Sequence, residues 1–322
     1  MITHLWSRCN INPHDNGWNK ILKSYFSLAL ILLLTLGTLR GGATSISKYV
    51  SINDIPPLSY AMWQSMVAAI LLISMGYIKT KRFPPIFTRP IFFVTCALIG
   101  VAIPNVVFFY VVQTLSAGTM AVLLTLVPLF TYVLVLTLQV ERFDAVRVGG
   151  IAMGFSGALI IATPSLTDGL NFNWTVIIAM ICPLGYAGMS VFIARYPVRH
   201  SHPFLLAGGT HLVAFLFLLP TAILTNEYLS IWKDPGLIES LVVVHGVIAA
   251  VAYSLFFKIV ELAGPVFYSF STYIIAITGI CWGWFIFGET HHYSFWLAVV
   301  LILGGLTIVN LRRKEKTPVI GV

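Results

Sequence analysis

Charged side chains are scarce in this sequence. Only 9% of its 322 residues are Asp, Glu, Lys or Arg, whereas soluble domains contain roughly 25%. Apolar residues make up 58% of the chain, and its mean hydropathy is +0.91. A soluble fold of this size has too few charges to cover so much apolar surface. The composition therefore excludes a soluble enzyme, a disordered chain and a soluble nucleic-acid-binding domain, and it indicates a polytopic membrane protein.

Cysteine and nucleotide-binding motifs are equally sparse. The 4 cysteines form no Cys-x-x-Cys pair, and three of them lie inside apolar runs, as small buried hydrophobes do. The pairs His200/His202 and His291/His292 have no third ligand nearby in the sequence. No Gly-x-x-x-x-Gly-Lys-Ser/Thr motif is present to use ATP. We therefore predict no metal and no other cofactor.

Apolar segments of about 20 residues, the length that crosses a bilayer, follow one another along the chain. The predicted helices are 24–47, 57–78, 90–112, 117–139, 146–163, 174–195, 203–224, 237–259, 264–287 and 294–311. A polar linker at 164–173 divides them, and tails at 1–23 and 312–322 flank them. The sequence thus predicts an all-α membrane protein with ten transmembrane helices.

Lys and Arg are distributed unequally between the two sides of this layout. If the N-terminus is cytoplasmic, sixteen of the 19 basic residues fall on the cytoplasmic side. Only Lys48 and Lys233 fall outside, and Arg40 lies within the first helix. Because cytoplasmic loops carry an excess of Lys and Arg, both termini are predicted to be cytoplasmic. The net charge of +8 therefore needs no nucleic-acid partner.

The second half of the chain weakly repeats the first at an offset of about 148 residues. Glu141 falls on Glu289, and Gly157-Ala158 in the fifth helix falls on Gly305-Leu306 in the tenth. Either these matches reflect two five-helix repeats, at 24–163 and 174–311, or they are chance similarities among apolar helices. Since five is odd, true repeats would enter the membrane from opposite sides and be inverted.

Short motifs in both halves resemble one known family. In the first half these are Leu36-Gly37-Thr38, Ala117-Gly118, Pro128 ten residues later, Glu141-Arg142-Phe143 and the glycines 149, 150, 154 and 157. The second half echoes them with Ala263-Gly264, Phe287-Gly288-Glu289 and Gly304-Gly305. Together they resemble the drug/metabolite transporter superfamily, specifically its EamA-type ten-helix members. The resemblance covers residues 24 to 311.

This sequence departs from the family pattern in three places. Leu36 precedes Gly37 where the family often has Trp, and Gln64 stands where a basic residue is common. Ala276 occupies the position that matches Pro128 in the other half. These departures concern the substrate class and leave the expected architecture unchanged.

Polar and ionisable groups inside apolar segments are the first candidates for a site, because they are costly in hydrocarbon. Arg40 follows Gly37 in a Gly-x-x-x-Gly frame, and either meets a carboxylate or phosphate of a substrate or reaches the outer headgroups. Asn105 follows Pro104, which frees a backbone carbonyl one turn earlier. Asn105 either contacts a ligand or pairs with a neighbouring helix.

His245 is the third candidate, in the eighth predicted helix. Ala249, Ala252 and Phe256 share its helix face, so small residues leave space beside it. It either takes part in binding and proton coupling or is a hydrogen-bonded packing residue. His211 in the seventh predicted helix is a weaker candidate.

The resemblance implies a chamber between helices 1, 3, 4, 6, 8 and 9, and this adds the aromatic residues Tyr186, Tyr253 and Tyr273 as candidate cavity residues. For each of them packing is the alternative. Glu141 and Pro128 are expected to be structural residues at helix ends. Glu289 is expected to fix the turn after the ninth helix, and a proton-coupling role is the alternative.

The leading functional hypothesis is a secondary transporter, more commonly an exporter in this family, for a small organic metabolite or drug-like molecule. It would sit in the inner membrane of a bacterium and use an ion gradient or substrate exchange. The alternative is a polytopic membrane enzyme acting on a lipid-linked substrate, although no clustered His or paired Asp motif supports it. The expected partners are the substrate and the lipid bilayer, and a homodimer is left open.

Overall fold

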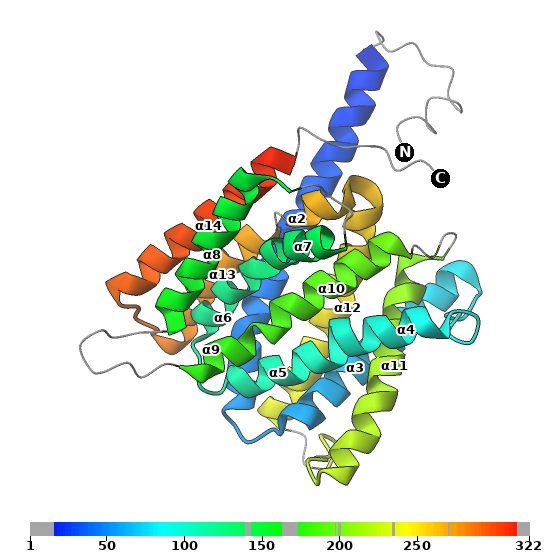
Figure 1. Ribbon diagram of the computed structural model, residues 1–322. Helices are drawn as coiled ribbons and strands as arrows, with labels where there is room; N and C mark the ends of the chain where they lie inside the picture. The colour runs from blue at the N-terminus through cyan, green and yellow to red at the C-terminus, as the bar shows by residue number, and fades with distance from the viewer. Residues whose placement is uncertain are drawn as a thin grey trace.

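The computed structural model describes residues 16–138, 143–162, 173–196, 198, 201–233, 236–269 and 271–313. Every regular element within these residues is helical (Figure 1). The helices are α2 (Asn16–Ser51), α3 (Pro57–Thr80), α4 (Pro90–Ala97), α5 (Ile103–Val111), α6 (Ala117–Leu123), α7 (Val127–Thr137), α8 (Ala145–Ala162), α9 (Trp174–Ala179), α10 (Ile181–Arg195), α11 (Pro203–Leu224), α12 (Leu237–Ser269), α13 (Ser271–Phe287) and α14 (Tyr293–Arg313).

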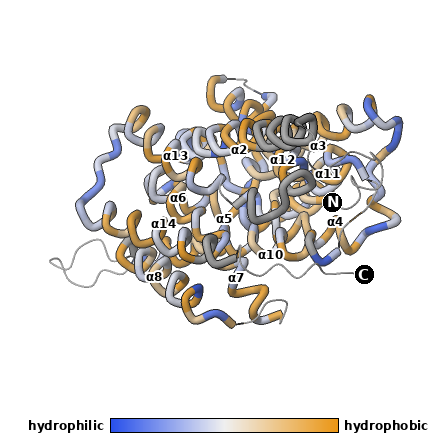
Figure 2. The backbone as a smooth tube through the Cα atoms, turned by 90° about the horizontal axis from the view of Figure 1, so that it is seen from above, coloured by the Kyte–Doolittle hydropathy of each residue, from blue (hydrophilic) through white to orange (hydrophobic). Residues whose placement is uncertain are grey.

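Seven stretches of helix are long and apolar enough to cross a membrane. They are Leu30–Ser51, Pro57–Thr80, Pro90–Val111, Ala117–Thr137, Trp174–Ile193, Pro203–Leu224 and Leu237–Ile259. Three further apolar helices, Ala145–Ile160, Ser271–Phe287 and Tyr293–Gly305, are shorter. In Figure 2 the hydrophobic colour runs along the helices, and the hydrophilic colour gathers mainly in the turns between them. The chain is an all-helical, multi-pass membrane protein.

Two of the spans are interrupted near their middle at a proline. A π-helical turn, η1 (Leu98–Ala102), joins α4 to α5 just before Pro104. A 3₁₀ turn, η2 (Leu124–Leu126), joins α6 to α7 just before Pro128. Because proline lacks the N–H that an α-helix requires, the backbone departs from regular α geometry there. Pro128 therefore begins a helix inside its span.

Helices α2 and α13 pack closely against each other. A Cβ atom at Gly37 would lie 3.2 Å from the carbonyl oxygen of Ser271, and one at Gly41 would lie 3.0 Å from the backbone nitrogen of Gly279. The hydroxyl of Thr278 also lies 3.3 Å from the carbonyl oxygen of Gly37. The Gly-x-x-x-Gly frame thus allows the two backbones to approach each other, as such frames do between membrane helices.

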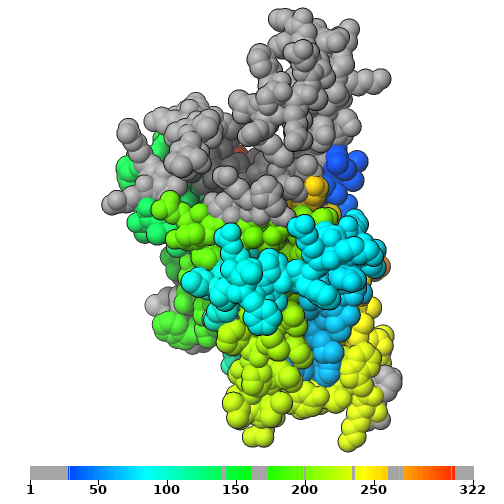
Figure 3. All heavy atoms as spheres, turned by 90° about the vertical axis from the view of Figure 1, so that its right-hand side faces the viewer, coloured from blue at the N-terminus to red at the C-terminus, as the bar shows by residue number. Residues whose placement is uncertain are grey.

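The helix contacts have an internal symmetry. Among the ten predicted helices, α2 is the first, and it packs on the eighth (α12) and the ninth (α13). Helix α10 belongs to the sixth, and it packs on the third (α5) and the fourth (α7). Exchanging each predicted helix with the one five places away therefore turns the first set of contacts into the second. The pairs α3–α11 and α8–α14, which make the most extensive contacts, are each exchanged with themselves. Figure 3 shows α11 beside α3 and beneath the α4 segment on one face of the molecule.

Two predicted boundaries were wrong. The first helix was predicted to begin at residue 24, but α2 begins at Asn16. The sequence placed a break between the eighth and ninth helices at residues 260–263, but α12 continues to Ser269. Gly264 and Pro265 were interpreted as the start of a new helix, yet a single proline removes only one helical hydrogen bond and kinks a helix as readily as it ends one. Lys258 consequently lies on α12 and not in a loop.

Candidate functional site

A cavity opens where α2, α3, α5, α10 and α12 converge. Its volume is about 490 Å³ when the space at its open mouth is included. Residues from both halves of the chain line it: Arg40, Ala43, Thr44, Ser47, Gln64, Asn105, Phe108, Phe109, Leu124, Tyr186, His245, Ile248, Ala249, Ala252 and Tyr253. Concave sites that combine apolar side chains with a few convergent polar groups are typical of small-molecule binding.

Arg40 lies on the wall of this cavity. Its guanidinium carbon is 5.0 Å from the ring centroid of Tyr186 and 5.9 Å from that of Tyr253. Its Nη1 donates to the hydroxyl oxygen of Tyr268 at 3.3 Å. The side chain is therefore held among aromatic rings on the wall of the cavity.

The amide and imidazole groups of the cavity form one continuous chain of hydrogen bonds. Tyr186 donates to Asn105 Oδ1 at 3.0 Å, and Asn105 Nδ2 donates to Gln64 Oε1 at 2.9 Å. Gln64 Nε2 lies 2.9 Å from His245 Nε2, and His245 Nδ1 lies 2.7 Å from the hydroxyl of Tyr60. Five side chains from four helices are thus linked across the site.

The direction of these bonds follows from the donors available. Since Gln64 accepts at Oε1 from Asn105, its amide nitrogen must donate to His245 Nε2. His245 then carries its proton on Nδ1 and donates it to Tyr60. In this arrangement His245 is neutral. Turning both amide groups over reverses every bond in the chain, because amide oxygen and nitrogen exchange places.

Pro104 explains the position of Tyr253. Proline at this position leaves the carbonyl of Gly100 without its helical N–H partner. The hydroxyl of Tyr253 donates to that carbonyl at 2.9 Å. The freed backbone group that the sequence predicts is therefore present, but a protein side chain occupies it. This bond ties α12 to the π-helical turn of the third predicted helix.

Most of the predicted site residues lie together. Arg40, Asn105, Tyr186, His245 and Tyr253 all line the cavity. Tyr273 does not, because its hydroxyl lies 3.0 Å from that of Thr307 on α14. The resemblance placed Tyr273 on a helix that borders the chamber, but its side chain reaches α14.

Sequence reasoning missed Gln64 and Tyr60 as members of the site. Gln64 is buried and bonds both Asn105 and His245, and Tyr60 stacks on Phe109 with ring centroids 3.9 Å apart. Both belong to α3, which is the second predicted helix and was not among the helices expected to border the chamber. An amide inside an apolar span was the available signal, since such groups need a polar partner.

His211, on α11, is also buried and lies beside the site. Its ring meets Tyr253 edge-on with centroids 4.5 Å apart, and neither of its nitrogens has a hydrogen-bond partner. It is not among the residues that line the cavity.

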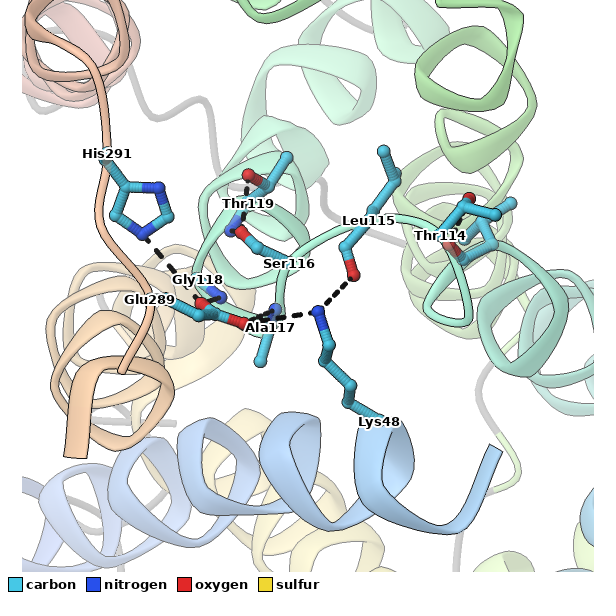
Figure 4. A network of polar contacts seen from close by, with 10 residues as sticks. Lys48, Thr114, Leu115, Ser116, Ala117, Gly118, Thr119, Glu289 and His291 are labelled. Atoms are coloured by element: carbon cyan, nitrogen blue, oxygen red, sulfur yellow. Dashed lines mark hydrogen bonds and ion pairs between the residues drawn. The ribbon is translucent and has the colours of Figure 1, made fainter. Parts of the chain in front are cut away.

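Glu289 lies outside the cavity, in the turn between α13 and α14 (Figure 4). Its carboxylate accepts the backbone N–H groups of Ala117 at 2.7 Å and Gly118 at 3.0 Å, at the start of α6. Lys48 Nζ lies 3.4 Å from the same carboxylate and donates to the carbonyl of Leu115 at 3.1 Å. Glu289 thus ties the turn of one half to two segments of the other.

His291 completes this cluster. Its Nε2 lies 3.8 Å from Glu289 Oε2, and its ring stacks on Phe295 with centroids 4.0 Å apart. Burial lowers the pKa of His291, the carboxylate of Glu289 acts in the opposite direction, and Lys48 lowers it further. Glu141, the predicted counterpart of Glu289, lies outside the described residues.

These features define a class: a multi-pass helical membrane protein with a cavity that is lined by residues from distant segments of the chain. The sequence profile of the EamA-like transporter family matches residues 27–163 and again residues 173–311. The chain belongs to this family, and the resemblance seen in its motifs is confirmed.

Individual relatives support the same assignment. The chain is 24% identical over 282 residues to the uncharacterized inner membrane transporter YedA of Escherichia coli K12, which covers 84% of this chain and 87% of that protein. It is 25% identical over 217 residues to an uncharacterized transporter of Archaeoglobus fulgidus, covering 66% of this chain and 73% of the relative. A solved crystal structure shares the fold, with a TM-score of 0.61 over 90% of this chain and 99% of that one, at 19% identity.

Proposed function

We propose that this chain is a secondary active transporter of a small organic molecule and not an enzyme. In this proposal ten helices form two inverted five-helix halves, at 24–163 and 174–311, with both termini in the cytoplasm. The seven spans and the three shorter apolar helices among the described residues support a count of ten. The two separate family matches and the symmetrical helix contacts support the division into halves. The name of the E. coli relative supports an inner-membrane location.

The cavity carries this proposal. It contains one fixed charge and a continuous hydrogen-bond chain, and both halves of the chain contribute to it. Residues from α2, α3 and α5 face residues from α10 and α12, so rocking of the halves would expose the same cavity first to one side and then to the other. Arg40, Asn105, Tyr186, His245 and Tyr253 are the proposed substrate-binding residues, and export is the proposed direction.

His245 is the proposed proton-binding group if an ion gradient drives transport. When protonated it has two N–H donors, so Gln64 must turn its oxygen toward it, and Asn105 and Tyr186 must then reverse their bonds as well. Proton binding at His245 would in this way reverse the hydrogen bonds as far as Tyr186, at the other end of the hydrogen-bond chain. Glu289 is proposed as a structural residue, because backbone N–H groups and Lys48 already occupy both of its oxygens.

The test is counterflow in proteoliposomes that contain the purified full-length protein. Vesicles loaded with an unlabelled candidate should transiently accumulate the same labelled compound, because a carrier exchanges substrate through a site that saturates. The experiment is repeated with and without a pH gradient, which separates proton coupling from pure exchange. Flux that neither saturates nor shows counterflow for any compound class would contradict the proposal and favour a channel or an enzyme.

A further inference from the structure

The positive charge of the cavity has no anionic partner among the side chains that the structure describes. Arg40 is the one fixed charge among the described residues that line the cavity. Its neighbours are the ring faces of Tyr186 and Tyr253 and the hydroxyl of Tyr268, all of which are neutral. Lys48 and His291 each form an ion pair with Glu289, and Arg40 takes part in neither of these pairs. A cation held within a membrane span in this way favours an anion that arrives from outside.

Arg40 also has the geometry to hold a carboxylate. A guanidinium presents five N–H donors in a rigid fork, and the bond to Tyr268 uses one nitrogen. The fork matches the two oxygens of a carboxylate, with two parallel charge-assisted hydrogen bonds. A doubly charged phosphate would keep one negative charge unpaired in the cavity, since Arg40 supplies a single positive charge.

The remaining wall of the cavity is neutral. The hydroxyls of Thr44 and Ser47 donate to backbone carbonyls of their own helix, at 2.6 and 2.7 Å. The amides of Gln64 and Asn105 are bonded to each other. No acidic side chain is present among the described lining residues to accept an ammonium group.

The rest of the described lining is apolar. It consists of Ala43, Phe108, Phe109, Leu124, Ile248, Ala249 and Ala252. These side chains suit a hydrocarbon or aromatic body, whose burial removes apolar surface from water.

From this distribution of charge we propose that the cavity binds a singly charged organic carboxylate. Its carboxylate pairs with Arg40, and its apolar body packs against Phe108, Phe109 and Ala249. Zwitterionic amino acids bind weakly, because their ammonium group finds no carboxylate. This inference rests on the proposed function, in that the cavity is taken as the substrate site.

Binding to the purified full-length protein in detergent micelles tests the proposal at constant pH 7. The probes are benzoate, phenylacetate and hexanoate, each with its neutral amide, together with phenylalanine and phenyl phosphate. Dissociation constants are measured by thermal-shift titration. We expect at least one carboxylate to bind saturably, and its amide, phenylalanine and phenyl phosphate to bind at least about tenfold more weakly, the loss typical of one charge-assisted contact.

Two variants assign the preference to Arg40. Arg40→Gln should abolish the preference for carboxylate over amide, and Arg40→Lys should retain it at reduced affinity, because lysine keeps the charge and loses the fork. Lys233→Gln removes a positive charge from an exposed position and should change nothing. The comparison of carboxylate with amide on the unaltered protein remains decisive if Arg40→Gln does not fold.

Four results would overturn the proposal: no binding by any carboxylate, equal affinity for carboxylate and amide, preference for phenylalanine or phenyl phosphate, or an unchanged preference in Arg40→Gln. Counterflow of a neutral or zwitterionic compound would accompany such a result if the proposed transporter function still holds. Absence of counterflow with every compound class would contradict the transporter function itself.

Discussion

The buried polar side chains of the cavity stabilise one another as a single unit. Gln64 is its central member, since it accepts from Asn105 and donates to His245. The buried polar groups of the cavity form hydrogen bonds with one another. Because these bonds join side chains of α3, α5 and α12, they fix the relative positions of the three helices. Such a chain loses more when one member is removed than when an isolated bond is lost.

Replacing Gln64 with leucine should destabilise the protein. The substitution leaves Asn105 Nδ2 and His245 Nε2 without partners inside the bundle, at a cost of about 1–3 kcal/mol for each group. This destabilisation would appear as a lower melting temperature of the purified variant. Gln113→Leu is the matched control, because Gln113 is exposed and should change the melting temperature little. Equal melting temperatures for both variants would show that the hydrogen-bond chain does not hold the cavity together.

Replacing His245 with asparagine should separate exchange from proton-driven transport. Asparagine retains a donor and an acceptor but binds no proton. We expect counterflow to persist at a lower affinity for the substrate, because His245 also lines the cavity, and accumulation driven by a pH gradient to be lost in proteoliposomes. His211→Asn is the control, since His211 is equally buried but does not line the cavity. Proton-driven accumulation that survives in His245→Asn would exclude His245 as the coupling group.

For single residues, the sequence could predict which side chains belong to the candidate site but not which of them form hydrogen bonds with one another. Arg40, Asn105 and His245 stand out because polar groups are rare in apolar spans. Tyr60 and Gln64 join them only because α3 packs against α12, and no local pattern reveals that contact. Tyr273 was chosen by its helix alone, and the sequence does not determine which face of α13 meets the cavity.

Among the elements, α8 and α14 show how small residues position whole helices. A Cβ atom at Gly150 would lie 2.9 Å from the carbonyl oxygen of Gly305 and 3.1 Å from the side chain of Ile308. The next residue, Gly149, has nothing within 4 Å of the same position. Gly150 therefore allows α8 and α14 to approach closely, whereas Gly149 makes no such contact.

Gly150→Ala should destabilise the protein by roughly 1–3 kcal/mol, because the methyl group forces the two backbones apart. Gly149→Ala should leave stability unchanged or raise it by up to about 1 kcal/mol, since alanine is the better helix former. Melting temperatures of the two purified variants provide the comparison. Equal destabilisation by both substitutions would contradict the close packing of α8 on α14.

The turn between α13 and α14 should respond to acid. Because burial lowers the pKa of His291 in the folded protein, the unfolded chain binds a proton more readily as the pH falls through about 6.5. His291 therefore contributes to a loss of stability between about pH 6.5 and its lower folded pKa. In His291→Gln the drop in melting temperature between pH 7.5 and pH 5.5 should be smaller than in the unaltered protein.

The neighbouring His292 provides the control for that experiment. It is exposed and interacts with Ser294 on its own segment. His292→Gln should leave the acid-induced drop unchanged. A drop as large in His291→Gln as in the unaltered protein would show that proton binding at His291 does not weaken the cluster around Glu289.

The element boundaries were largely predictable, for a physical reason. Predicted helices at 203–224 and 57–78 correspond to α11 (Pro203–Leu224) and α3 (Pro57–Thr80), because proline and charged residues bound the apolar runs. The end of α12 was not, because the helix continues past Lys258, Glu261 and the Gly264-Pro265 pair, which in the sequence mark a boundary. The π-helical turn before Pro104 could also not be predicted from the local sequence.

For the whole molecule, α2 and α10 make matched contacts with the helices around them, and the cavity lies where these helices meet. The weak repeat and the positive-inside bias of the sequence predict two inverted halves, but they do not predict which side chains from distant segments meet in the cavity. Only the packed bundle brings Arg40, Gln64, Asn105 and His245 to one site.

Alternating exposure of this cavity is the central claim, and the accessibility of a single cysteine tests it most directly. Ala249→Cys, in a chain whose 4 native cysteines are replaced by alanine, places a thiol on the cavity wall. In oriented vesicles a membrane-impermeant maleimide should label it from either side, and a transported substrate should slow the labelling. Ile277→Cys, exposed on the outside of α13, should be labelled from neither side. Labelling of Ala249→Cys from one side alone, or from neither, would contradict the account.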